Sequence, residues 1–152
     1  MHRRRIVPTL LFAAAFVLVP GSAAAQAPTF EYAVKVVCGN LDPSTVPGRF
    51  ATAVNVHNPA TAETRFRMKV AVAGAGQADF VTSFRNFRLR PDGALVISCT
   101  EVRDLTGRTV VDGFVVIQSA VEVDVVAVYT AAGSASVSAM AVERVPPRRM
   151  QQ

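Results

Sequence analysis

The strongest constraint on the fold is that apolar and polar residues alternate along most of the chain after Gln26. Residues 64–72 are the clearest example. Their apolar face carries Phe66, Met68, Val70 and Val72, and their polar face carries Arg65, Arg67 and Lys69. Such alternation is typical of a β-strand with one buried and one exposed face. Because no later segment has a convincing helical period, the sequence predicts an all-β fold.

Turn residues divide these alternating stretches into seven or eight short strands. We expect strands at residues 30–38, 49–57, 64–72, within 80–89, at 94–99, 113–118, 121–130 and 136–145. The polar segment at 100–108 has room for a single helical turn. This spacing favours an antiparallel, immunoglobulin-like β-sandwich, with a small β-barrel as the alternative. The chain has no tryptophan, so membership of the antibody superfamily does not follow.

The first 25 residues have the composition of a cleavable export signal. Three arginines at positions 3–5 precede an uncharged apolar run at residues 6–19, and Ala23 and Ala25 stand at the positions that signal peptidase requires to be small. The run is shorter than the roughly 20 residues of a membrane-spanning helix. We therefore expect cleavage after Ala25 and no transmembrane anchor afterwards. Residues 26–152 would form one exported domain, periplasmic or secreted, with a tail that frays from about Pro146; Sec and twin-arginine export both remain open.

Charge and cysteine content narrow the function. Removing the signal removes three arginines and no acidic residue, so the net charge falls from +5 to +2. The basic character belongs mostly to the signal, and we expect no nucleic-acid partner. Cys38 and Cys99 are the only cysteines, and an even number in an exported chain predicts one disulfide. With His57 as the single histidine of the mature chain, no metal site or cofactor is expected.

His57 is the one residue suited to acid–base chemistry near neutral pH. Catalysis would require a nucleophile and an orienting carboxylate beside it, and no serine lies in a Gly-x-Ser-x-Gly motif. We expect instead a strand-end histidine that bonds a turn backbone, and a protein that is not an enzyme. Two carboxylate pairs are candidate sites as well, Glu101 with Asp104 and Glu122 with Asp124. The last two are expected on one solvated strand face.

The most informative surface feature is a set of basic residues. Six could converge on one positive face: Arg65, Arg67, Lys69, Arg85, Arg88 and Arg90. Such a face would bind an anionic glycan or lipid head groups. The alternative is that these charges keep an exposed strand soluble and unpaired. Three phenylalanines beside them, Phe80, Phe84 and Phe87, would line the site or pack under a loop.

Five segments resemble a group of small exported bacterial proteins. They are Val37-Cys38-Gly39, Asn55-Val56-His57-Asn58-Pro59, Arg90-Pro91-Asp92, residues 124–130 and Val142-Glu143-Arg144-Val145-Pro146. The resemblance implies an exported β domain and carries no activity.

These observations favour a non-catalytic binding or interaction domain of the bacterial cell envelope or the extracellular space. Its partner would be an anionic glycan, a lipid head group or another envelope protein. Two alternatives stay open. One is a structural subunit that associates by strand addition through the valine-rich segment at residues 121–128. The other is a small envelope hydrolase that uses His57.

Overall fold

A computed structural model describes residues 27–40, 48–74, 76, 78–133 and 137–150. The predicted signal peptide lies outside these residues. The described part contains one short helix and these strands: β1 (Phe30–Asn40), β2 (Arg49–His57), β3 (Thr64–Ala73), β4 (Ala78–Val81), β5 (Arg85–Leu89), β6 (Ala94–Ile97), α1 (Cys99–Thr106), β7 (Val111–Ser119), β8 (Asp124–Ala132), β9 (Val137–Arg144) and β10 (Arg148–Arg149).

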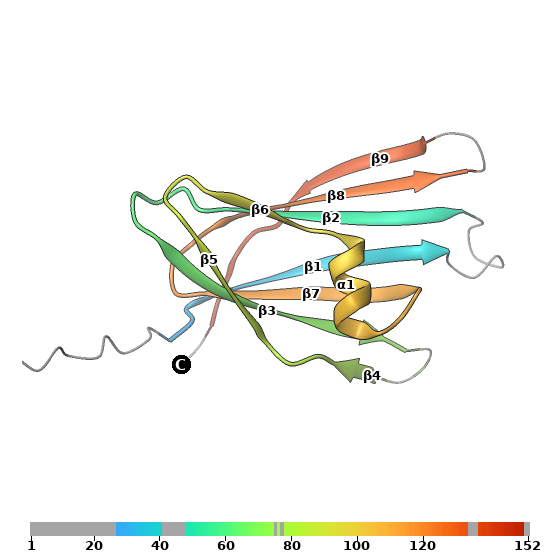
Figure 1. Cartoon of the computed structure of the whole chain (residues 1–152), viewed down its shortest axis with the longest axis horizontal. Helices are drawn as coiled ribbons and strands as arrows, with labels where there is room; N and C mark the ends of the chain where they lie inside the picture. The colour runs from blue at the N-terminus through green and yellow to red at the C-terminus, as the bar shows by residue number, and fades with distance from the viewer. Residues whose placement is uncertain (1–26, 41–47, 75, 77, 134–136, 151–152) are drawn as a thin grey trace, which may run out of the picture.

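The strands form two layers that share β1 (Figure 1). In one layer, here called sheet A, β7 lies between β1 and β3, while β4 and β5 pair with β3 and β10 pairs with β1. In the other, sheet B, the order is β6-β2-β8-β9. The last two residues of β1 pair with the start of β2 and connect the layers. Every pairing is antiparallel and the sheet does not close, so the predicted all-β, sandwich-like fold is confirmed and the barrel alternative is wrong.

Several elements differ from the sequence prediction. The strand expected at 121–130 begins only at Asp124, and the one expected at 94–99 ends at Ile97, because Cys99 begins α1. The strand expected within 80–89 is divided into β4 and β5, because Thr82 bonds the backbone of Val70 through both its N–H and its side-chain oxygen. Where a single helical turn was expected, the structure has the longer helix α1, which begins with a Ser98–Glu101 capping box. The segment expected to fray pairs with the start of β1 at β10.

The core consists of the inward-facing residues of both sheets and is mostly valine. Its fully buried members include Tyr32, Val34, Val36, Val54, Val56, Val70, Val111, Val115, Ile97 and Ile117. Val102 of α1 is buried with them. A single cluster thus fills the space between the sheets, which is the arrangement expected when each strand buries one face.

A disulfide joins the end of β1 to the start of α1. Cys38 and Cys99 are bonded, with 5.5 Å between their Cα atoms, and both are buried. The predicted disulfide is confirmed. Thr52 of β2 lies beside it, where the sheets separate: its hydroxyl accepts from the N–H of Val37 at 3.0 Å, and its own N–H donates to the Cys99 sulfur at 3.2 Å. This side chain continues the contact between the layers beyond the last β1–β2 pair.

Candidate functional site

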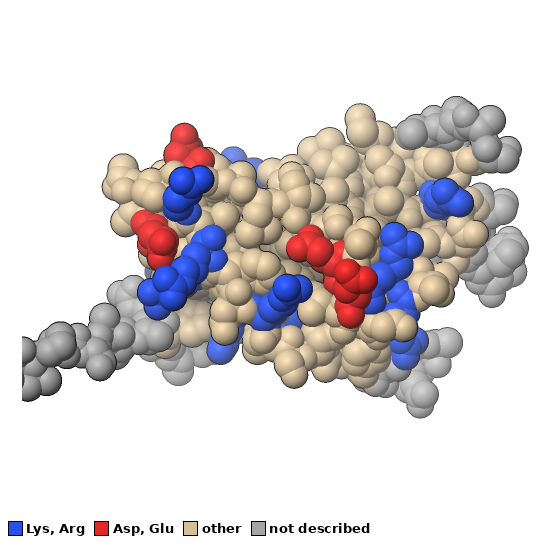
Figure 2. All heavy atoms as spheres, viewed as in Figure 1, with Lys and Arg blue, Asp and Glu red and all other residues tan. Residues whose placement is uncertain are grey.

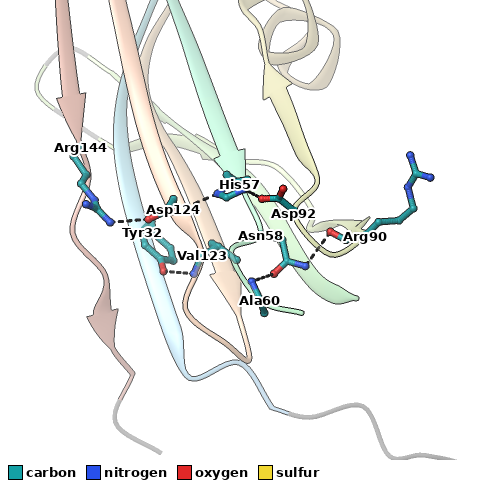
Figure 3. Close-up of polar contacts among 9 residues, drawn as sticks. All are labelled: Tyr32, His57, Asn58, Ala60, Arg90, Asp92, Val123, Asp124 and Arg144. Atoms are coloured by element: carbon teal, nitrogen blue, oxygen red, sulfur yellow. Dashed lines mark hydrogen bonds and ion pairs between the residues drawn. The ribbon is translucent and has the colours of Figure 1, made fainter. Parts of the chain in front are cut away.

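His57 ends β2 and lies between two carboxylates (Figure 3). Its Nδ1 is 3.2 Å from Oδ2 of Asp124, and its Nε2 is 3.0 Å from Oδ1 of Asp92. Asp124 begins β8, and Asp92 lies in the β5–β6 turn in the left-handed conformation, with φ 52°. The hydrogen bond to Asp92, and then the one to Asp124, raises the pKa of His57. A protonated ring donates to both carboxylates.

Arg144, the last residue of β9, extends this arrangement. Its guanidinium donates to Oδ1 of Asp124 at 2.6 Å. A row of alternating charges therefore crosses the sheet end, in the order Arg144, Asp124, His57 and Asp92 (Figure 3). A general base needs a free ring nitrogen that faces the proton it removes. Each nitrogen of His57 faces a carboxylate, so the row joins the ends of β2 and β8 to the β5–β6 turn.

Asn58, the residue after His57, adds further hydrogen bonds at the same end of the sheet. Asn58 is fully buried, and its amide donates to the carbonyls of Ala62 at 2.8 Å and Arg90 at 3.0 Å, while its oxygen accepts from the N–H of Ala60 at 3.1 Å. Sequence reasoning used Asn58 only as a strand end. The Asn58-Pro59 pair could have indicated this role in the sequence, because an asparagine side chain commonly hydrogen-bonds the backbone of a turn.

The carboxylate pairs do not form acidic sites. Glu122 lies in the loop before β8 and Asp124 begins the strand, so the expected shared strand face is wrong. Glu101 accepts from the Ser98 N–H at 2.9 Å and caps α1, while Asp104 is exposed on that helix. Among the described residues, no three histidine, cysteine or acidic side chains are grouped where they could hold a metal ion.

Four of the six predicted basic residues meet on the outer face of sheet A. Arg65, Arg67 and Lys69 alternate along β3, and Arg88 of β5 lies directly opposite Arg65. Arg85 is opposite the buried Met68 and so belongs to the other face of β5, although it is exposed. Arg90 follows β5 and points away from the sheet (Figure 3). One positive face made of all six residues does not form.

The four that meet have partners within the chain. Arg67 donates to the Gln118 side chain at 2.9 Å, and Arg67 and Lys69 lie 4.3 and 4.8 Å from the ring centre of Phe84. Arg65 and Arg88 share the carboxylate of Glu63: its Oε1 lies 4.0 Å from Nε of Arg65 and 3.8 Å from Nη1 of Arg88. Figure 2 shows basic and acidic side chains interspersed on the face it displays. The positive charge is therefore local and partly compensated.

The three phenylalanines near these arginines, Phe80, Phe84 and Phe87, also lie in different surroundings. Phe87 stacks on the buried Phe66 with ring centres 5.0 Å apart and belongs to the core side of β5. Phe84 supports the cations of β3, and Phe80 packs against the edge of the core. Phe84 is thus the member of the three that contributes to the basic surface.

The outer face of sheet B has a different character, because it is apolar. By register its outward-facing residues are mainly apolar: Ala94 and Val96 of β6, Ala51 and Ala53 of β2, Val126 and Val128 of β8, and Met140 and Val142 of β9. Asn55 of β2 and Thr130 of β8 are the polar residues among them. Val96 is 50% exposed, Met140 68% and Val142 65%. The charged residues on this face stand near its ends: Arg49 at one, and the row containing His57 at the other. No described element covers this apolar face.

The exposed edge of sheet B is not the one predicted. β8, which contains most of the valine-rich segment at 121–128, lies between β2 and β9. Within the described residues, β9 pairs with β8 alone and forms one edge, while the short β6 forms the other. Sequence reasoning missed Met140 and Val142. Val126 and Val128 were an available indication of an apolar outer face, because they occupy positions where a solvated strand would carry polar residues.

Comparison with protein-family models and with curated proteins finds no match. The fold is similar to the crystal structure of Thermotoga maritima 1070, with a TM-score of 0.53 and 9% sequence identity over 80% of this chain and 94% of that one. No described helix is long and apolar enough to cross a membrane. At this identity the likeness concerns the fold alone.

Proposed function

We propose that this chain is an exported, non-catalytic interaction domain that binds another protein through the outer face of sheet B. The observation that carries the proposal is the exposure of Val96, Met140 and Val142 on one largely apolar face, in which Asn55 and Thr130 are the polar residues between the ends. Large contiguous apolar patches on single domains commonly mark interaction sites, because leaving them in water forgoes the free energy of burial.

The apolar residues lie next to one another on neighbouring strands, which supports an interaction surface rather than isolated exposed side chains. Val126 and Val128 face outward from the middle of sheet B, with Ala53 beside Val128 on β2 and Val142 beside it on β9. Small and branched side chains on neighbouring strands give a flat surface around Val128, and the nearest charged group is Arg144, which lies opposite Val126 and is paired with Asp124. A second protein surface could pack on such a face without burying an unpaired charge.

Export is supported by two independent features. The Cys38–Cys99 disulfide is buried within the core, as in proteins of oxidising compartments. The N-terminal sequence predicts a cleaved signal. Mass spectrometry of the protein recovered outside the inner membrane should give a chain that begins at Gln26. Recovery of the full-length chain from the cytoplasm alone would contradict export.

Site-specific photo-crosslinking in the producing cells tests the interaction surface. A photoreactive phenylalanine analogue would replace Val96 on the apolar face, and Asp104 on the exposed side of α1 would serve as the matched control. We expect protein adducts from position 96 and few from position 104. Equal yields at both positions, or none at either, would count against an interaction surface on sheet B.

A second candidate function rests on the exposure of Arg65 and Arg88, each 65% exposed at the side chain, with one carboxylate between them. With Arg67 and Lys69 they could bind an anionic glycan or a lipid head group. A ligand at 100 times its dissociation constant adds about 2.7 kcal/mol of stability. Heparin or anionic vesicles should then raise the melting temperature at low salt, and Arg65→Gln with Arg88→Gln should reduce the effect, whereas Arg103→Gln on α1 should not.

A further inference from the structure

We propose that a second copy of this chain pairs its β9 with β9 in antiparallel fashion about a two-fold axis. This inference goes beyond the proposed function, because it concerns the β9 edge of sheet B and not the outer face. Two identical four-stranded sheets would then join edge to edge and form one continuous sheet. The apolar outer faces of the two copies would become one surface.

The backbone of β9 is arranged for such pairing. Beyond the end of β9, the N–H of Val145 donates to the carbonyl of Val125 at 2.9 Å. Hydrogen bonding alternates along an antiparallel ladder, so the backbone groups of Val145, Glu143 and Ala141 point toward β8. Those of Arg144, Val142 and Met140 point away from β8, toward the open side of the sheet. These groups can bond a further strand without disturbing the existing pairs.

The features that usually prevent strand addition occur only near the two ends of β9: Glu143 lies opposite the buried Ala127 and so on the core side, and the ladder with β8 is irregular at Ala131 and Ala132. Natural edge strands are protected by proline, by inward-pointing charges, by bulges or by a covering element. Residues 137–142 contain no proline, glycine or charged residue, and the charges of β9 are confined to Glu143 and Arg144 at its end. The irregularity in the β8–β9 ladder falls at Ala131 and Ala132, near the other end. Between these ends the strand is regular and unprotected.

Charge and register favour a second copy as the added strand. Antiparallel pairing about a two-fold axis at Ala141 places Met140 opposite Val142 of the second copy. It also places Glu143 opposite Ala139, and Arg144 opposite Ser138, so no like charges face each other. With the axis at Ala141, every residue from Ser138 to Arg144 whose backbone groups point away from β8 pairs with a residue of the second copy. Met140 and Val142 both lie on the apolar outer face, so each copy continues the other's face across the junction.

Sedimentation equilibrium of the oxidised, exported protein tests association directly. Over concentrations from about 1 µM to about 1 mM, the range of weak to moderate affinities, we expect the average mass to rise from that of a monomer toward twice that value. A monomer throughout would overturn the inference.

Proline substitutions test whether the association uses the backbone edge. Met140→Pro removes an N–H that points away from β8, so it should give a monomer whose melting temperature stays within about 3 °C of the unmodified protein. Ala141→Pro is the matched control and removes an N–H that bonds β8, so it should lower the melting temperature much further. Met140→Ala keeps the N–H and should weaken association without abolishing it. A dimer that persists in Met140→Pro, or equal destabilisation by both prolines, would overturn the edge assignment.

Cysteine crosslinking tests the register. Ala141 and Ala139 are both exposed on β9. At the axis, Ala141→Cys would face its own copy in a non-hydrogen-bonded pair, where Cα atoms lie about 4.5 Å apart and a disulfide can form. Ala139→Cys would face Glu143 and should remain uncrosslinked. Crosslinking at 139 in preference to 141 would contradict the register.

The two proposals can fail separately. A strict monomer that still forms adducts with other proteins from position 96 would refute self-pairing and keep the interaction domain. A monomer without adducts would refute both. A dimer abolished by Met140→Pro, with the disulfide at position 141, would support self-pairing, whereas support for the interaction surface requires adducts from position 96.

Discussion

Removing the Cys38–Cys99 disulfide should lower the free energy of unfolding by about 4 kcal/mol, because the crosslink closes a loop of 61 residues in the unfolded chain. The free energy comes mainly from restricting the unfolded ensemble. In the folded state both cysteines are buried, and the Cys99 sulfur accepts the N–H of Thr52 at 3.2 Å. Losing that contact in a Cys→Ala variant adds up to about 1 kcal/mol.

Urea unfolding of Cys38→Ala/Cys99→Ala measures this loss. With an m-value of about 2 kcal/mol/M, expected for a domain of this size, the midpoint should fall by about 2 M. The control is the unmodified chain reduced while unfolded and then refolded with reductant present. It also lacks the crosslink but keeps both sulfurs, so its stability should lie within about 1 kcal/mol of the double variant.

The comparison can refute the loop-entropy argument in two ways. A loss below about 1 kcal/mol in both samples would show that the unfolded chain is already as compact as the crosslink makes it. A large loss in the alanine variant alone would place the stabilisation in sulfur packing between the sheets. Only a similar loss in both samples, near the value expected from the loop length, agrees with the argument.

Three further perturbations follow from particular contacts. Hydrogen bonds to carboxylates raise the pKa of His57 above its ordinary 6.5. The stability that the protonated ring adds is therefore complete below pH 6.5 and is lost as the pH rises through the raised pKa. His57→Gln should remove this pH dependence, as measured by urea unfolding between about pH 5 and pH 9. Gly113→Ala should cost about 1–3 kcal/mol by urea unfolding, because the added methyl group would collide with the carbonyl oxygen of Ala71; an unchanged midpoint would contradict this close approach. Tyr32→Phe leaves the buried Val123 N–H without its acceptor at 2.9 Å and should cost about 1–3 kcal/mol, seen as a lower melting temperature.

The strands themselves were largely predictable, because alternation reports directly which residues face the core. The expected strand at 49–57 has the bounds of β2, and the one at 64–72 is a single residue shorter than β3. The extent of α1 could also have been anticipated from Ser98 and Glu101, whose spacing is that of a capping box. β10 could not, because a two-residue strand after two prolines has no periodicity to detect.

Neighbours across the sheets were not predictable from periodicity. Alternation placed His57 on an outward face, but its partners Asp92 and Asp124 are 35 and 67 positions away in sequence. The same limit applies to Arg85, which was grouped with the β3 cations although the break before β5 places it on the opposite face. A pattern along one strand gives the face of a residue, whereas strand order and register decide which residue lies opposite.

Four of the five segments on which the expected resemblance rests meet at one place in the structure. They supply His57, Asp92, Asp124 and Arg144, one residue from each, and together they form the row of charges at the end of sheet B (Figure 3). The row joins β2, β8, β9 and the β5–β6 turn. These contacts hold together strand ends that are far apart in the sequence, because the ring of His57 lies between two carboxylates.

The pattern of β8 connects the sequence to the proposed dimer. A strand with one solvated face should alternate, yet β8 carries Val125 and Ala127 inward and Val126 and Val128 outward. Strands that are apolar on both faces are typical of sheets covered on both sides. In the single chain, sheet A covers the inward face and no described element covers the outward one. Pairing at the β9 edge would extend this apolar face across two copies without covering it, so the outward valines would stay available to the partner proposed for the outer face of sheet B.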